Sequence, residues 1–271
     1  MERLTVAAAI RSVLETADPS LKVMATRKLA RGWRADGLEH AFDVAMPQRP
    51  ARPVEPILLP VNQMPKRRKG GSIVGRIAML HAFAHIEFVA IDLALDMAGR
   101  FGSGQPREFI TDWLSVAADE AMHFCLLQRR LRDYGSHYGA LPAHGGLWES
   151  AYATRNNILA RLAVVPMVLE ARGLDVSETT IARLKSAGDT KSAAILYRIY
   201  IDEIRHVGVG SRWFAKVCDS QQKPRAKTWQ ALVKSYFKGA VKAPFNDSAR
   251  ESAGLPREYY QPIALTRPSA Q

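Results

Sequence analysis

The sequence predicts an all-α protein built on a four-helix bundle, with short N-terminal helices, a proline-rich arm and a C-terminal helical extension. Three observations lead to this fold. From Ser72 onward, apolar residues recur with helical periodicity through four long stretches. Turns rich in glycine and proline separate these stretches, and no stretch shows the alternation of paired strands. We therefore expect four parts: residues 1–46, 47–71, 72–218 and 219–271.

The N-terminal part predicts two short helices within residues 3–41. The first runs from about Thr5 to Glu15, and the second opens at Asp18-Pro19, an N-cap residue followed by proline. Six prolines then exclude a continuous helix: Pro47, Pro50, Pro53, Pro56, Pro60 and Pro65. We expect an ordered arm along the bundle rather than a disordered linker. The reason is that the arm carries apolar residues to bury: Val54, Ile57, Leu58, Leu59 and Val61.

The bundle helices are expected at residues 72–100, 106–134, 147–172 and 189–218. Gly173 is expected to end the third helix as a left-handed cap, and Ser177 to cap a short helix over residues 178–187. Asp189 or Thr190 begins the fourth. In the tail, one helix is predicted near Lys227–Val241, followed by a loop-rich end.

Composition excludes several classes of protein. Of the 271 residues, 47% are hydrophobic and 24% charged, which is ordinary for a soluble globular protein. No stretch approaches the ~20 apolar residues of a membrane span, and the amphipathic N-terminus lacks a signal-peptide core. We therefore expect a cytoplasmic protein without membrane insertion. Cys125 and Cys218 form no CxxC pair, which argues against a disulfide framework, a zinc ribbon or a rubredoxin centre and favours two buried free thiols.

The net charge of +12 favours an anionic partner such as nucleic acid, acidic lipid or an anionic substrate. The basic residues lie in four clusters, at Arg27, Lys28, Arg31 and Arg34; Lys66, Arg67, Arg68 and Lys69; Arg129, Arg130 and Arg132; and Lys223, Arg225 and Lys227. A solvated helix face explains each cluster equally well. Aromatic residues that would stack on bases are not interleaved with them.

Two copies of one motif carry the chemistry. Asp119-Glu120-Ala-Met-His123 lies in the second long helix, and Asp202-Glu203-Ile-Arg-His206 lies in the fourth. Glutamate at i and histidine at i+3 share one helix face, so both side chains can reach the same ion. One Glu-x-x-His pair arises often by chance, whereas two in the long helices of one bundle form a specific pattern.

The remaining long helices each supply one glutamate, Glu87 in the first and Glu170 in the third. Thirty-three residues separate Glu87 from Glu120 (120 − 87), and also Glu170 from Glu203 (203 − 170), as in a duplicated helix pair. The midpoint of Glu87 and Glu120 falls in the turn at residues 102–106, so these carboxylates should face one another. The second pair is less regular, because the expected break at Gly173 lies just after Glu170.

This inventory is the pattern of di-metal carboxylate proteins, and its oxygen and imidazole ligands suit iron or manganese. The expected ligands are Glu87, Glu120, His123, Glu170, Glu203 and His206. A metal-free interior is the alternative. It is disfavoured because Glu87 and Glu170 lie in apolar stretches, where an unpaired carboxylate costs several kcal/mol.

Four further residues are expected to support the ligands. Metal-bound imidazoles donate their second N–H to a carboxylate, so Asp119 is expected to serve His206 and Asp202 to serve His123. An intrahelical contact of each aspartate is the alternative. His85 and Tyr200 are the candidates for contacts near the metals, His85 in the second shell or along an access route and Tyr200 by a hydrogen bond or as an electron carrier, and core packing is the favoured alternative for both.

These residues resemble an uncharacterised ferritin-like family of bacterial proteins, a domain of unknown function in the di-iron carboxylate superfamily. The resemblance rests on Leu80–Glu87, Ala118–His123, Glu170–Asp175 and Asp202–His206 and covers about residues 50–245. A more distant similarity is to the di-iron tRNA hydroxylase, through Glu170-Ala-Arg172 and His123-Phe124. The resemblance implies a ferritin-like bundle with two iron ions, or manganese or a mixed centre.

The first functional hypothesis is a di-iron oxidoreductase that uses O₂ to hydroxylate or oxidise an organic substrate, with an anionic substrate or tRNA favoured by the charge. It requires an electron donor and predicts a monomer or small homo-oligomer. The second is iron handling, ferroxidation or peroxide scavenging, which would favour a large shell. The third is a basic module that binds nucleic acid, with a structural metal.

Overall fold

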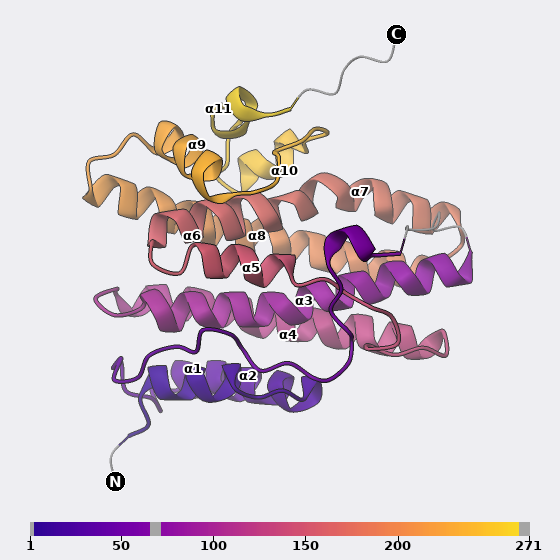
Figure 1. The fold of residues 1–271 in the computed structure, drawn as a ribbon, viewed down its shortest axis with the longest axis horizontal. Helices are drawn as coiled ribbons and strands as arrows, with labels where there is room; N and C mark the ends of the chain where they lie inside the picture. Colours follow the sequence, from indigo (N-terminus) through magenta and orange to yellow (C-terminus); the bar gives the residue numbers. More distant parts are fainter. Residues whose placement is uncertain (1–2, 66–71, 266–271) are drawn as a thin grey trace. The chain divides into compact units, whose positions relative to one another are not determined.

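The computed structural model describes residues 3–65 and 72–265, and the described residues form helices and no strand. The prediction of an all-α protein is therefore confirmed. The chain divides into two compact units, residues 1–152 and 153–271. Each unit contains a long helical hairpin (Figure 1). The predicted boundaries at residues 46, 71 and 218, and the joining of the two hairpins into one bundle, stay predictions.

The first unit is built on the hairpin of α3 and α4. Its helices are α1 (Val6–Leu14), α2 (Pro19–Arg34), η1 (Val61–Gln63), α3 (Ile73–Phe101), α4 (Arg107–Asp133) and α5 (Gly146–Ala153). α3 and α4 lie side by side, α1 contacts α3, and α2 contacts α4 (Figure 1). The predicted N-cap Asp18 is confirmed, because its side chain accepts a hydrogen bond from the Leu21 N–H. Thr5 and Ser72, where two other helices were predicted to begin, cap α1 and α3 in the same way.

The second unit is built on the hairpin of α7 and α8. Its helices are α6 (Ile158–Val164), η2 (Val165–Glu170, a π-helical segment), α7 (Ala171–Ser186), α8 (Thr190–Ser220), α9 (Arg225–Tyr236), α10 (Asp247–Ser252), α11 (Arg257–Tyr260) and η3 (Gln261–Ile263). α8 begins at the predicted cap, since the Asp189 carboxylate accepts from the Ser192 N–H at 3.1 Å. The tail is more helical than predicted, because short helices α10 and α11 lie in the expected loop-rich end.

The prediction of one helix over residues 147–172 is wrong. The helix is interrupted at residues 154–157, and α6 begins anew with Asn157 as its cap, whose side chain accepts from the Ala160 N–H at 3.0 Å. Adjacent asparagines, Asn156 and Asn157, favour such a break, because short polar side chains bond the nearby backbone in place of the helix ladder.

Gly173 does not end a helix, and Ser177 does not cap one. Both lie inside α7, where the Ser177 hydroxyl donates to the Gly173 carbonyl at 2.7 Å. The helix ends instead at Gly188, which has φ +75°. The Gly188 N–H bonds the Lys185 carbonyl and the Asp189 N–H bonds the Leu184 carbonyl, the two bonds of a Schellman cap.

A π-helical segment replaces the predicted regular helix just before Glu170. Pro166 lies within it, and proline has no N–H to donate to the preceding turn. α8 accommodates this segment through Gly210, because a Cβ on Gly210 would lie 2.4 Å from the Cβ of Pro166. The close approach of the Pro166 ring to the backbone of α8 therefore requires glycine at position 210.

The proline-rich arm is ordered within the described residues, but its apolar side chains are not what holds it. Val54 is 95% exposed, Ile57 64% and Leu58 45%, so their expected burial is wrong. Backbone hydrogen bonds fix the arm instead, from the Leu59 N–H to the Ala143 carbonyl and from the Ala143 N–H to the Ile57 carbonyl. The end of the arm, residues 66–71, and the side chain of Val61 lie outside the described residues.

α3 is the one helix of the described residues that is long and apolar enough to span a membrane by composition. Its most apolar window is 67% buried inside the protein, as in the core helix of a soluble protein. Three acidic residues, Glu87, Asp92 and Asp96, also lie in this helix. The absence of membrane insertion stays a prediction.

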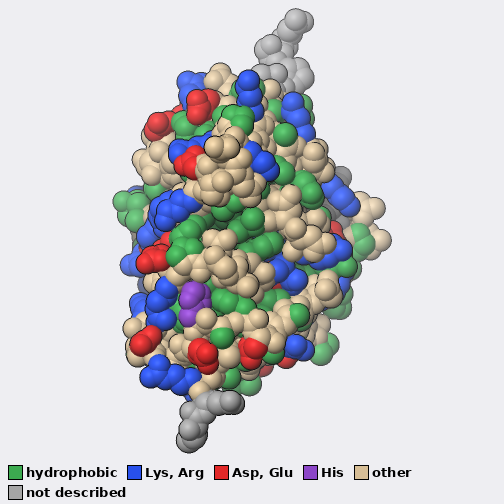
Figure 2. Space-filling model, turned by 90° about the vertical axis from the view of Figure 1, so that its left-hand side faces the viewer, with side chains coloured by type: hydrophobic (Ala, Val, Ile, Leu, Met, Phe, Trp, Pro, Cys, Tyr) green, Lys and Arg blue, Asp and Glu red, His purple; other side chains and the backbone are tan. Residues whose placement is uncertain are grey.

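Basic side chains are spread over the surface. On the face drawn in Figure 2, lysines and arginines are scattered among acidic and apolar side chains and form no continuous tract. Arg27, Lys28, Arg31 and Arg34 are exposed on α2, as a solvated helix face requires. Elsewhere Arg225 is paired with Asp219, and Arg130 with Asp133. The cluster Lys66–Lys69 lies outside the described residues.

Both cysteines are free thiols, as predicted, but the predicted burial holds for Cys218 alone. Cys218 is buried and Cys125 is half-buried, and burial raises the pKa of both thiols above the usual value. Neither therefore has the lowered pKa of a reactive thiolate.

Candidate metal centre

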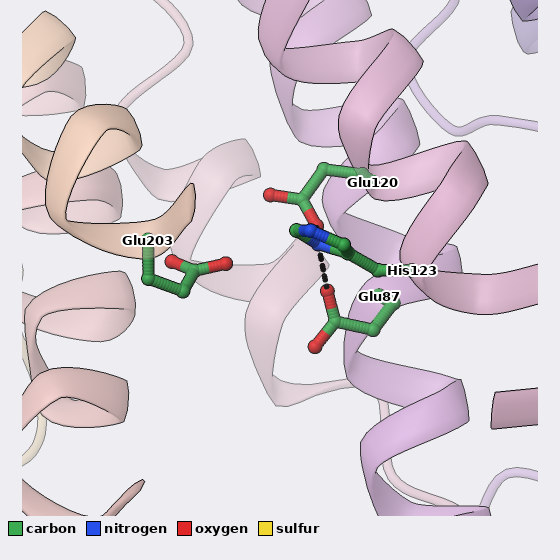
Figure 3. Close-up of side chains that lie close together, drawn as sticks. All are labelled: Glu87, Glu120, His123 and Glu203. Carbon is green, nitrogen blue, oxygen red and sulfur yellow. Dashed lines mark hydrogen bonds and ion pairs between the residues drawn. The ribbon is translucent and has the colours of Figure 1, made fainter. Parts of the chain in front are cut away.

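The α3–α4 hairpin brings three predicted ligands together in the first unit. The turn between these helices spans residues 102–106, and Glu87 and Glu120 are equidistant from it. Glu120 and His123 lie one helical turn apart on α4 and face Glu87 on α3 (Figure 3). The prediction that Glu87 and Glu120 lie at the same height along the hairpin and face one another is therefore confirmed.

The three side chains form a buried cluster. Nδ1 of His123 lies 3.3 Å from Oε2 of Glu87 and 3.2 Å from Oε2 of Glu120. Each residue offers one ligand atom within 4.8 Å of the others. Glu87 is 4% exposed, and Glu120 and His123 are fully buried. This buried Glu/His cluster can hold a metal ion.

Electrostatics at the cluster favour a bound cation. Burial raises the pKa of Glu87 well above its usual value, and the nearby Glu120 carboxylate raises it further, while the hydrogen bond from His123 acts in the opposite direction. Two carboxylates in one buried site cannot both ionise cheaply unless a proton or a metal ion lies between them. Carboxylate oxygens with one imidazole are ligands that suit iron or manganese.

The α7–α8 hairpin repeats this arrangement in the second unit. Because α7 continues to Ser186, the break expected at Gly173 is absent and the turn spans residues 187–189. Glu170 lies 17 residues before this turn (187 − 170) and Glu203 lies 14 residues after it (203 − 189), so the second pair is offset by three residues. Nδ1 of His206 lies 3.5 Å from Oε1 of Glu203 on α8. Glu203, which Figure 3 also labels, is 8% exposed, and His206 is fully buried.

Glu170 lies at the end of the π-helical segment, where it is half-buried. π-helical turns inside α-helices occur frequently at functional sites, because one extra residue per turn redirects the side chains that follow. The sequence signal for this segment was Pro166, four residues before Glu170. The ligand roles of Glu170, Glu203 and His206 stay predictions.

The supporting residues of the second unit, Asp202 and Tyr200, have partners within that unit. The Asp202 carboxylate accepts from Arg198 at 2.6 Å along α8. Asp119 is half-buried on α4. The expected bonds from His206 to Asp119 and from His123 to Asp202 join different units and stay predictions. Tyr200 donates to Glu178 at 3.0 Å and accepts from Asn246 at 3.1 Å, so its hydroxyl ties α8 to α7 and to the tail.

His85 is held away from the ligand cluster. Its two ring nitrogens lie 3.0 Å from the Tyr138 hydroxyl and 3.2 Å from the His144 carbonyl oxygen. Burial lowers the pKa of His85 to about 4, so the ring is neutral near pH 7. These contacts correspond to the packing alternative rather than to a contact with the metal ligands.

An ion-paired group beside the cluster was not predicted. Asp92 on α3 is fully buried and bonds Lys22 of α2 at 2.6 Å and Arg52 of the arm. Both cations lie over the Phe88 ring, at 5.3 and 5.5 Å from its centroid. The only sequence signal was an aspartate inside an apolar helix, because its partners lie 70 and 40 residues away.

Comparison with known proteins supports one part of the resemblance, a bacterial family of unknown function, while the ferritin-like di-iron assignment stays a prediction. Residues 15–261 match the family described as "Protein of unknown function (DUF455)". The chain belongs to DUF455. A relative described as an uncharacterized protein of Haemophilus influenzae is 40% identical to this chain over 211 residues. These residues cover 76% of this chain and 73% of the relative. No solved structure matches the chain. The DUF455 match spans all six predicted ligands and both hairpins.

Proposed function

We propose that the chain is a non-haem di-iron oxidoreductase that uses O₂ to hydroxylate or oxidise an organic substrate. The observation that carries the proposal is the buried cluster of Glu87, Glu120 and His123, whose ligand atoms lie within 4.8 Å of one another. The equal spacing in the second hairpin supplies a matching half in Glu170, Glu203 and His206. We propose that the two halves form one centre for two metal ions.

The residues would act as ligands and as a dry enclosure. Iron ions, when bound, would supply the electrons for the reduction of O₂. The carboxylates neutralise the charge of the metals, and the imidazoles complete their coordination. Apolar neighbours on α3 and α4, among them Phe88 and Phe124 with ring centroids 5.3 Å apart, exclude water from the buried carboxylates.

The net charge of the protein is the basis for the proposed class of substrate. A net charge of +12 favours an anionic substrate, and tRNA is the first candidate to test. The electron donor is proposed as a separate protein or small molecule, because iron that has reduced O₂ must be reduced again.

Ligand variants with matched controls test the proposal. We expect Glu120→Ala and His206→Ala to lower iron and manganese content while the helical circular dichroism remains. Glu108→Ala is the control on α4, where Glu108 is exposed in the first turn. His40→Ala is the exposed histidine control. Full metal content in both ligand variants would refute the assignment, and a loss in His206→Ala alone would refute a role for the first hairpin.

A further inference from the structure

A cavity of about 220 Å³ opens in the second unit beside the π-helical segment. Met167 and Val168 of that segment form one wall, and Trp229 of α9 and Phe237 form another. This volume holds several water-sized molecules. It is smaller than the roughly 300–1,000 Å³ of sites for drug-sized ligands, so it suits a single ring or a short chain.

The charges that line this cavity leave an excess of cations. Arg172, Lys242 and Arg250 contribute three positive charges, and Asp175 contributes one negative charge. Arg250 donates to both oxygens of Asp175 at 2.8 Å, and Nη1 of Arg172 lies 3.4 Å from Oδ2 of the same carboxylate. One carboxylate therefore faces three cations, and the excess of positive charge attracts an anion.

Arg172 is already oriented, yet it keeps donors for a ligand. Its Nη1 donates to the Lys242 carbonyl at 2.9 Å, to the Pro244 carbonyl at 3.2 Å and to Oδ2 of Asp175 at 3.4 Å. Within the described part of the chain its Nε and Nη2 have no hydrogen-bond partner, and 43% of the side chain is exposed. A guanidinium fixed in this way binds a carboxylate with little further loss of side-chain entropy.

Trp229 adds a second, independent observation. The side chain is fully buried in the wall of the cavity, and its indole N–H has no hydrogen-bond acceptor within residues 3–65 and 72–265. A buried donor without an acceptor costs about 1–3 kcal/mol and calls for an explanation in a native structure.

We propose that this cavity binds a small monoanion with an apolar body, namely a carboxylate on a short aliphatic chain or a single ring. Arg172 and Lys242 bind the carboxylate, while Met167, Val168 and Phe237 contact the apolar body. The site lies within one unit and uses none of the six predicted metal ligands. It extends the proposed function without resting on it, although its wall belongs to the segment that ends at Glu170.

Octanoate and 1-octanol form a matched pair of probes, one anionic and one neutral. The full chain without added metal is titrated with each by calorimetry and by tryptophan fluorescence. We expect saturable binding of one octanoate per chain, at least tenfold tighter than that of 1-octanol. Trp229→Phe should remove the fluorescence change, because Trp229 lines the cavity.

Three variants locate the site. Arg172→Gln should weaken octanoate at least tenfold and leave 1-octanol unchanged, whereas Ala240→Trp, which fills the cavity, should weaken both. Arg183→Gln is the control, an exposed arginine of the same helix α7. Circular dichroism and the unfolding midpoint verify that each variant folds. Absence of saturable octanoate binding, equal affinity for both probes, or binding that neither Arg172→Gln nor Ala240→Trp weakens would overturn the proposal.

Discussion

A neutral histidine holds the loop that follows α4, and this makes the stability of the protein sensitive to acid. Nε2 of His81 accepts hydrogen bonds from the N–H groups of Gly139 at 3.0 Å and Leu141 at 3.4 Å. The ring stacks on Tyr138 with centroids 5.5 Å apart. Only a neutral imidazole nitrogen can accept such bonds, so protonation of His81 removes both.

The magnitude follows from the pKa of His81. Burial, with a smaller contribution from His137, lowers this pKa from 6.5 to about 4. Between these values the unfolded chain binds the proton and the folded chain does not. The contribution to stability is therefore complete above pH 6.5 and is lost as the pH falls toward 4. At about 1.4 kcal/mol per pH unit the total reaches about 3 kcal/mol.

His81→Gln tests this account, because glutamine keeps an acceptor oxygen but does not titrate. Urea unfolding is followed by circular dichroism at about pH 7, 6 and 5. We expect the free energy of unfolding of the natural protein to fall more steeply than that of the variant, by about 1 kcal/mol per pH unit. His40→Gln, at an exposed histidine, should retain the steep dependence. Parallel pH curves for the natural protein and His81→Gln would refute the reasoning.

Three further predictions concern the metal cluster, the core and the surface. In metal-stripped protein, Glu87→Gln should abolish a loss of stability of about 1.4 kcal/mol per pH unit. The folded protein keeps the Glu87 proton above pH 4.5 and the unfolded chain loses it, so the free energy of unfolding falls as the pH rises from 4.5 toward the raised pKa of Glu87. Denaturant midpoints measured across this pH range report the fall. Asp92→Ala leaves Lys22 buried without its carboxylate and should cost about 3–5 kcal/mol in urea unfolding. Binding of tRNA, measured by filter retention, should weaken steeply with added salt, and salt-insensitive binding would contradict a phosphate-dependent contact.

Local signals in the sequence were sufficient for most helix starts and for the first ligand cluster. Helices begin close to Thr5, Asp18, Ser72 and Asp189, as predicted, and each of these residues caps its helix, because an N-cap bond depends on residues only three apart. Glu87 and Glu120 are also nearly equally far from one short turn, which was sufficient to predict that they face one another. A hairpin with a short turn leaves little freedom in register.

The errors arose where distant parts of the chain decide the local structure. Gly173 and Gly188 carry the same local signal for a helix end, but only Gly188 adopts a positive φ and ends the helix. Pro166 is tolerated within helical structure where Gly210 of α8 leaves space for it. The arm is fixed by backbone bonds to Ala143, which no periodicity could reveal.

The buried ion pairs of Asp92 with Lys22 and Arg52 could not be predicted from the sequence either. Its partners come from α2 and from the arm, and nothing in their spacing marks them as neighbours. The cavity beside Met167 is assembled similarly from η2, α9 and the tail. Sites of this kind depend on packing between elements and have no motif.

Metal content per chain is the most direct test of the central claim. The protein is expressed with iron and manganese available, and bound metal is measured by mass spectrometry after removal of loosely held ions. The ferrous form is then exposed to O₂ while its optical absorption is recorded. We predict about two iron ions per chain and an absorption change that depends on O₂. Protein that retains no transition metal after reconstitution would contradict the account, because the six glutamates and histidines would then have only a structural role.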